Sequence, residues 1–167
     1  GSPMRPDLFW LPDIVPGRLG VAPRPRGGDW LEDEIAAWKR AGVTRVVSLL
    51  EADEAADLGL SDEPAAVQAA GIAFEAFPVP DRGLPPSRRA FAELARRLAD
   101  GIAAGETVVV HCRQGIGRAG MLAVAVLTAT GAPLSDAVRR VSDARGRPVP
   151  ETPEQLRWLA EHTEGTP

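Results

Sequence analysis

The sequence predicts a single α/β domain in which helices flank a central, mostly parallel, twisted β-sheet. Short β-branched apolar segments alternate with longer amphipathic segments, and this alternation is typical of βαβ units. A length of 167 residues, with 44% hydrophobic and 25% charged residues, is sufficient for one hydrophobic core. We therefore assign residues 5–165 to one domain and interpret residues 1–4 as the scar of a cleaved tag.

The expected elements follow from these patterns and from the residues that end them. The strands are expected at residues 9–15, 20–22, 44–50, 72–79 and 107–111. The helices are expected at residues 29–41, 61–70, 87–104, 117–130, 134–144 and 153–162. Glycines directly follow four of these helical patterns, as expected of helix C-caps: Gly42, Gly71, Gly105 and Gly131. The β-branched strand at 107–111 is expected at the centre of the sheet.

Charge and composition exclude several classes of protein. The formal net charge is −4 and Lys39 is the only lysine, which argues against nucleic-acid binding. The longest apolar helical run, residues 121–130, is too short to span a bilayer. The single cysteine cannot form an internal disulfide and fits a reducing compartment. We expect a monomeric, cytoplasmic protein that binds neither nucleic acid nor membranes.

Residues 111–120 read HCRQGIGRAG and connect the predicted central strand to a predicted helix. A loop in this position directs backbone N–H groups and the positive end of the helix toward one point. Gly115 and Gly117 permit the backbone angles that such a loop requires. The segment is therefore expected to bind an oxyanion, for which phosphate is the natural candidate.

Three side chains of this loop suggest its chemistry. A helix N-terminus and a nearby cation both favour the thiolate form of a cysteine, so Cys112 is a candidate nucleophile. Arg118 offers a planar fork that can hold two phosphate oxygens as charge redistributes in the transition state. We expect His111 to play a supporting role by hydrogen bonding to the backbone around the loop.

The spacing Cys112-x5-Arg118, with Gly115 and Gly117 between, resembles the phosphate-binding loop of the cysteine-dependent protein tyrosine and dual-specificity phosphatases. The resemblance implies that residues 113–118 bind the substrate phosphate, through Arg113, Gln114, Gly115, Ile116, Gly117 and Arg118. It also implies a phosphorylated protein as substrate, with a phosphoinositide or another phosphoester as a further candidate, and a reaction that needs no metal or cofactor. A cysteine that only fills the core is the alternative, but it would require neither the glycines nor the arginine.

The family also requires a general acid, and the segment PVPDRGLPP at residues 78–86 resembles the acid loop of the small dual-specificity enzymes. Asp81 is the candidate, because it follows a predicted strand and precedes a predicted helix. It would protonate the leaving oxygen and later accept a proton from the attacking water. The alternative is an ordinary turn aspartate, since this composition favours turns for local reasons.

Gln155 has two interpretations. The segment RGRPVPETPEQ resembles the loop that in many relatives places a glutamine beside the hydrolytic water. The spacing of Thr152 and Gln155 is equally that of a capping box at the start of the last helix. Both interpretations stay open at this point.

One position departs from the family pattern. The residue after the loop arginine is usually serine or threonine, and here it is Ala119. Because that hydroxyl aids departure of the thiolate, alanine should slow hydrolysis of a phosphocysteine more than its formation. We expect a phosphotyrosine phosphatase, with phosphoserine and phosphothreonine as further candidate substrates. A slow or inactive phospho-ligand-binding pseudophosphatase and a rhodanese-type sulfurtransferase are the alternatives.

Overall fold

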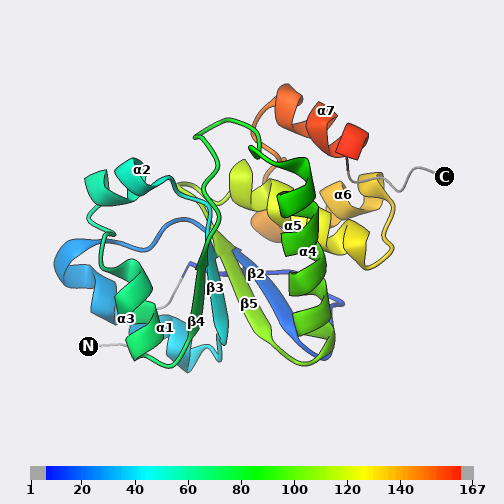
Figure 1. Cartoon of the computed structure of the whole chain (residues 1–167). Helices are drawn as coiled ribbons and strands as arrows, with labels where there is room; N and C mark the ends of the chain where they lie inside the picture. Colours follow the sequence, from blue (N-terminus) through cyan, green and yellow to red (C-terminus); the bar gives the residue numbers. More distant parts are fainter. Residues whose placement is uncertain (1–6, 163–167) are drawn as a thin grey trace.

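The computed structural model describes residues 7–162, which form one α/β domain (Figure 1). Its strands are β1 (Phe9–Trp10), β2 (Arg18–Ala22), β3 (Arg45–Ser48), β4 (Ala73–Ala76) and β5 (Thr107–His111). Its helices are α1 (Leu31–Arg40), α2 (Ala52–Asp57), α3 (Glu63–Ala69), α4 (Arg88–Ala103), α5 (Arg118–Ala129), α6 (Leu134–Arg145) and α7 (Pro153–His162), with a short 3-10 helix, Gly28–Trp30, before α1. The scar assigned to residues 1–4 and both ends of the predicted domain range lie outside the described residues.

The strand order is β1-β2-β5-β3-β4, and every pair except β1–β2 is parallel. This arrangement confirms the predicted mostly parallel sheet with residues 107–111 at its centre. All five residues of β5 are buried, because helices cover both faces of a parallel sheet. Val108 and Val110 face one apolar cluster, and Val109 faces the other.

Helices cover the two faces of the sheet in separate groups (Figure 1). Helices α1 and α3 pack on one face, and α4, α5 and α6 pack on the other. The ten residues from Arg118 to Leu127 of α5 are all buried, because this helix lies between the sheet and its neighbouring helices. Within residues 7–162, no helix combines the length and the apolar character needed to cross a membrane.

The structure differs from the predicted elements in two places, one strand end and one additional helix. The first strand ends at Trp10 rather than at residue 15, because Pro12 and the left-handed Asp13 (φ 62°) form a turn. A helix that the sequence analysis does not predict, α2, occupies residues 52–57 and begins with a capping box between Glu51 and Glu54. The other predicted elements coincide with observed ones to within three residues at each end.

Candidate functional site

The loop of residues 112–117 lies between β5 and α5, at the carboxyl end of the central strand (Figure 1). Ligand sites of open parallel sheets occur at this edge, because the loops there converge. Cys112 follows β5 directly and is only 3% exposed, within the apolar cluster beneath α5. The core therefore fixes the position of the sulfur.

Two backbone amides point at the cysteine sulfur. The N–H of Gly115 donates to Cys112 Sγ at 3.3 Å, and the N–H of Ala119 donates at 3.4 Å. Gly115 adopts a left-handed conformation (φ 74°), and a Cβ there would lie 2.7 Å from the carbonyl oxygen of Ala22. Only glycine meets both conditions, so the loop geometry predicted from the sequence depends on this residue. Both N–H groups therefore direct the positive ends of their dipoles at the sulfur.

Arg118 begins α5 and is 2% exposed, yet both terminal nitrogens of its guanidinium have hydrogen-bond partners. Nη1 donates to the carbonyl oxygen of Val79 at 2.9 Å and to Oε1 of Glu54 at 2.7 Å. Nη2 donates to Oε2 of Glu54 at 2.9 Å and to Oδ1 of Asp81 at 3.0 Å. Burial alone would lower the pKa of Arg118, but its bonds to Glu54 and the charges of Cys112, Glu54 and Asp81 raise it. The arginine is thus held as a cation beside the cysteine.

Glu54 is a site residue that the sequence analysis missed. It comes from α2, is 8% exposed, and forms a two-bond fork with Arg118 while Nε of Arg113 donates to its Oε2 at 3.0 Å. Burial would raise the pKa of Glu54, but hydrogen bonds and the charge of Arg118 lower it to about 2. The capping-box spacing with Glu51 was the only sequence signal of this residue, and it indicates a helix start rather than a site.

Asp81 lies on the loop between β4 and α4, where its side chain is 49% exposed. Its contact with Arg118 places the carboxylate in the same pocket as Cys112. The next residue, Arg82, is in a left-handed conformation (φ 58°) and pairs with Glu151 at 2.5 Å. Side chains therefore attach the exposed tip of this loop, whereas Val79 and Leu84 on either side of the tip pack in the core.

A pocket of about 130 Å³ brings the predicted residues together. It is lined by Asp81, Arg82, Cys112, Arg113, Gln114, Gly117, Arg118 and Glu151. Two of the predicted phosphate-binding residues lie behind this surface: Gly115 contributes its amide to the sulfur, and Ile116 is buried in the apolar cluster. The Arg113 side chain is 43% exposed and paired with Glu54, so it reaches the pocket mouth as a partly neutralised cation.

Gln155 is fully buried at the start of α7 and forms the capping box considered above. The N–H of Gln155 donates to Oγ1 of Thr152 at 3.1 Å, and Gln155 Oε1 accepts from the N–H groups of Thr152 and Glu151. Its Nε2 donates to the carbonyl oxygen of Gly83 at 3.1 Å, and a Cβ on Gly117 would lie 3.2 Å from it. The side chain therefore joins α7 to the acid loop, next to the cysteine loop.

His111 has two partners in a fully buried position. The predicted backbone contact exists, between Nδ1 and the carbonyl oxygen of Cys112 at 3.3 Å. The shorter contact was not predicted: Nε2 lies 2.7 Å from Oε2 of Glu63, which is 2% exposed. Since a carbonyl oxygen can only accept, Nδ1 is the donor in the first contact, and Nε2 is the ring nitrogen that faces Glu63. Glu63 thereby sets the orientation of the histidine that precedes the nucleophile.

Arg145, in the last turn of α6, is the first residue of the RGRPVPETPEQ segment, which is expected from the sequence to flank the site. Its Nε donates to the carbonyl oxygen of Gly115 at 3.1 Å, and its Nη2 donates to that of Gln114 at 3.0 Å. The guanidinium also lies 4.1 Å from the centre of the Phe9 ring. Burial and the charge of Arg147 lower the pKa of Arg145. This arginine keeps the loop carbonyls turned outward, so that the loop amides face the sulfur.

Solved structures resemble this fold closely. A kinase associated phosphatase variant, with serine at the catalytic-site cysteine, aligns with a TM-score of 0.85 and 18% identity over 96% of this chain and 95% of that chain. Tk-PTP in its active form aligns with a TM-score of 0.79 and 28% identity over 98% and 100% of the two chains. A P. aeruginosa TpbA variant, in complex with pTyr, aligns with a TM-score of 0.61 and 17% identity over 96% and 84%. No curated protein sequence matches this chain.

A protein-family model matches by sequence as well. It is described as "Polymorphic toxin system, DSP-PTPase phosphatase" and matches residues 21–132, about two thirds of the chain. The matched segment begins in β2 and ends just after α5, so it includes Asp81, Cys112 and Arg118. This match and the shared fold lead to one assignment: the chain belongs to the DSP-PTPase phosphatase family of polymorphic toxin systems.

Proposed function

We propose that this protein removes phosphate from phosphotyrosine side chains of proteins, and from phosphoserine and phosphothreonine more slowly, through a phosphocysteine intermediate. One observation carries the proposal: Cys112 Sγ accepts two amide hydrogen bonds in a pocket that Asp81 and Arg118 also line. The similarity to Tk-PTP, at 28% identity over the whole chain, supports it. The TpbA complex supports phosphotyrosine as the first substrate to test.

In the first step, the Cys112 thiolate attacks phosphorus and the bond from phosphorus to the ester oxygen breaks. Asp81, entering the reaction as a carboxylic acid, gives its proton to the departing oxygen. Loop amides and Arg118 stabilise the negative charge of the transferring phosphoryl group. The products of this step are the free alcohol and a phosphocysteine.

In the second step, water attacks the phosphocysteine and the sulfur–phosphorus bond breaks. Asp81, now a carboxylate, takes a proton from the water, and Cys112 leaves as a thiolate. Only the amides of Gly115 and Ala119 stabilise the departing sulfur, because Ala119 has no hydroxyl to add a third hydrogen bond. Hydrolysis of the intermediate is therefore the slower step.

Substrate binding would change the contact between Arg118 and Asp81. Without phosphate, the arginine shares its Nη2 between Glu54 and Asp81. A phosphate dianion in the loop competes for the same guanidinium and repels the Asp81 carboxylate, which favours protonation of the acid. Phosphate binding thus frees Asp81 for the leaving oxygen and leaves Glu54 to hold the arginine in position.

The test is rapid-mixing kinetics with p-nitrophenyl phosphate, followed by phosphate release from a phosphotyrosine peptide. The wild type should release about one molecule of nitrophenol per enzyme molecule in a rapid burst and then turn over slowly. Cys112→Ser should show neither the burst nor the steady turnover. Binding of the phosphopeptide without phosphate release would instead support a phospho-ligand-binding protein. Turnover of thiosulfate without phosphate release would support a sulfurtransferase.

A second variant locates the slow step. Ala119→Ser supplies the hydroxyl that the family usually has. One added hydrogen bond to the departing sulfur should raise the steady-state rate by about tenfold. The rate of the burst should stay unchanged. Equal acceleration of both phases would contradict a bottleneck in hydrolysis of the phosphocysteine.

A further inference from the structure

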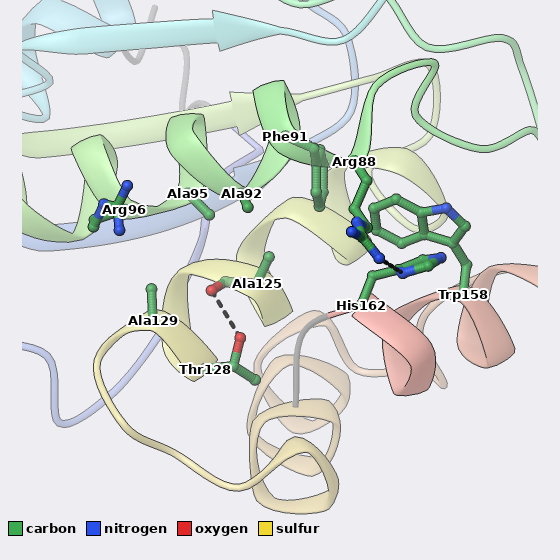
Figure 2. Close-up of a pocket in the computed structure, with 10 residues that line it drawn as sticks. All are labelled: Arg88, Phe91, Ala92, Ala95, Arg96, Ala125, Thr128, Ala129, Trp158 and His162. Atoms are coloured by element: carbon green, nitrogen blue, oxygen red, sulfur yellow. Dashed lines mark hydrogen bonds between the residues drawn. The ribbon is translucent and has the colours of Figure 1, made fainter. Parts of the chain in front are cut away.

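A second pocket, of about 230 Å³, lies between α4, α5 and α7 (Figure 2). It shares no lining residue with the pocket at Cys112. Its lining residues are Arg88, Phe91, Ala92, Ala95, Arg96, Ala125, Thr128, Ala129, Trp158 and His162. The combination of small apolar residues, aromatic rings and cations sets it apart from an ordinary gap between helices.

The floor and one end of this pocket suit a flat apolar group. Alanines of α4 and α5 leave space, because none has a side chain beyond Cβ. At one end, Phe91 meets the indole of Trp158 edge to face, with ring centroids 5.3 Å apart. Trp158 in turn meets the ring of His162 at 4.8 Å. Aromatic surfaces in this arrangement favour contact with another aromatic ring.

One arginine, Arg88, lies at this same end. Figure 2 shows Arg88 beside Trp158 and His162. Nη1 of Arg88 lies 3.4 Å from Nδ1 of His162. Arg96 lies two helical turns along α4, at the opposite end of the pocket. Among residues 7–162, neither Arg88 nor Arg96 forms an ion pair, whereas their neighbour Arg97 binds Glu75 through two hydrogen bonds. Glu161 is 69% exposed and lies outside the lining, and its carboxylate is 3.7 Å from Nε2 of His162.

We propose that this pocket is a second ligand site, which binds a small aromatic carboxylate. The ring would lie against Phe91 and Trp158, and the carboxylate would accept hydrogen bonds from Arg88, whose Nη1 faces Nδ1 of His162 when no ligand is bound. The arginine fork matches the geometry of a carboxylate, and the partly apolar surroundings strengthen that pairing relative to open water. Arg96 would face the far end of the ligand and contribute less.

The test is a titration with 2-naphthoate, followed by the NMR signal of the Trp158 indole N–H and by calorimetry. Binding in the micromolar to millimolar range should shift this signal, and the neutral analogue 2-naphthalenemethanol should bind at least tenfold more weakly. Arg88→Gln should reduce affinity for 2-naphthoate by about tenfold or more, and Arg96→Gln by less. Arg89→Gln is the matched control, because Arg89 is exposed on the same helix but does not line the pocket.

A second pair of variants tests whether the ligand occupies the volume of this pocket. Ala92→Leu should fill the pocket from its exposed rim and abolish binding, whereas Ala65→Leu, at an exposed position of α3, should not. The proposal is overturned if no binding occurs at millimolar 2-naphthoate, or if the alcohol binds equally well. It is also overturned if inorganic phosphate displaces the naphthoate, since the ligand would then occupy the Cys112 loop. A larger loss with Arg96→Gln than with Arg88→Gln would overturn the assigned orientation.

Discussion

The loop that carries Cys112 and the loop that carries Asp81 meet at Arg118 but are held in different ways. The cysteine is 3% exposed, follows the central strand and lies in the apolar core. The Asp81 side chain is 49% exposed, and its loop is attached mainly through Arg118, Gln155 and Arg82. The core and the backbone geometry hold the cysteine itself, whereas polar contacts hold the tip of the acid loop, between Val79 and Leu84, which pack in the core.

This difference fits the roles that we propose for the two loops in the reaction. The nucleophile and the amides must already be in place when phosphate arrives, because reorganisation during the reaction would cost rate. The acid must leave Arg118, reach the leaving oxygen and later face a water. We expect substitutions around Asp81 to change rates more than stability, and substitutions behind the cysteine loop to change stability as well.

Asp81→Asn should have the largest effect on catalysis. Without an acid, cleavage of a phosphotyrosine peptide should fall by about a hundredfold to ten-thousandfold. An ester with a good leaving group, such as p-nitrophenyl phosphate, needs less protonation and should lose much less. Stability should stay within about 0.5 kcal/mol of the wild type, since the side chain is half exposed. Equal losses on both substrates would contradict the role of Asp81 as general acid.

Glu54→Gln should have the largest effect on stability. It leaves Arg118 buried with a weakened partner, so unfolding in urea at pH 7 should be easier by about 3 kcal/mol. The lowered pKa of Glu54, about 2, means that its contribution is present above its ordinary value of 4.5 and is lost as pH falls toward 2. The difference between variant and wild type should therefore shrink below pH 4.5. Asp53→Asn, on an exposed position of the same helix, is the control.

Glu63→Gln should have an intermediate effect. It keeps an oxygen near His111 Nε2 but removes the charge of a buried pair, so stability should fall by about 1–3 kcal/mol. The NMR signals of the His111 ring should change, and those of His162 should not. Asp62→Asn, an exposed neighbour, should change neither. Unchanged His111 signals would contradict the pairing of Glu63 with the histidine.

Of these four substitutions, Gln155→Leu should have the smallest effect on activity and stability. It removes the cap of α7 and the bond to Gly83, with a cost of about 1 kcal/mol in stability. Because the acid loop loses one of its attachments, kcat on a phosphotyrosine peptide should fall several-fold with KM little changed. Glu154→Gln, on the exposed side of the same turn, should alter neither quantity. A loss of phosphocysteine hydrolysis alone would instead favour a role of Gln155 beside the water.

Much of the fold could be predicted because short sequence patterns mark the beginning and end of most of its helices and strands. The β-branched run of β5 and the glycine after α4 give the same boundaries in sequence and structure to within a residue. Helix α2 could not be predicted, because six residues with two aspartates and a glutamate have no apolar face. Its position depends on contacts of Glu54 with Arg113 and Arg118, which lie about 60 residues further along the chain.

Local patterns were sufficient to name Cys112, Arg118 and Asp81 as candidates, because the spacing of a phosphate loop and the composition of a turn are properties of short segments. The carboxylates Glu54 and Glu63, which hold Arg118 and His111, were not visible in this way. A carboxylate on one helix becomes the partner of a buried arginine or histidine only when the sheet brings distant segments together. Charge pairing in the interior acts over a few ångströms in space, and separation along the chain says nothing about that distance.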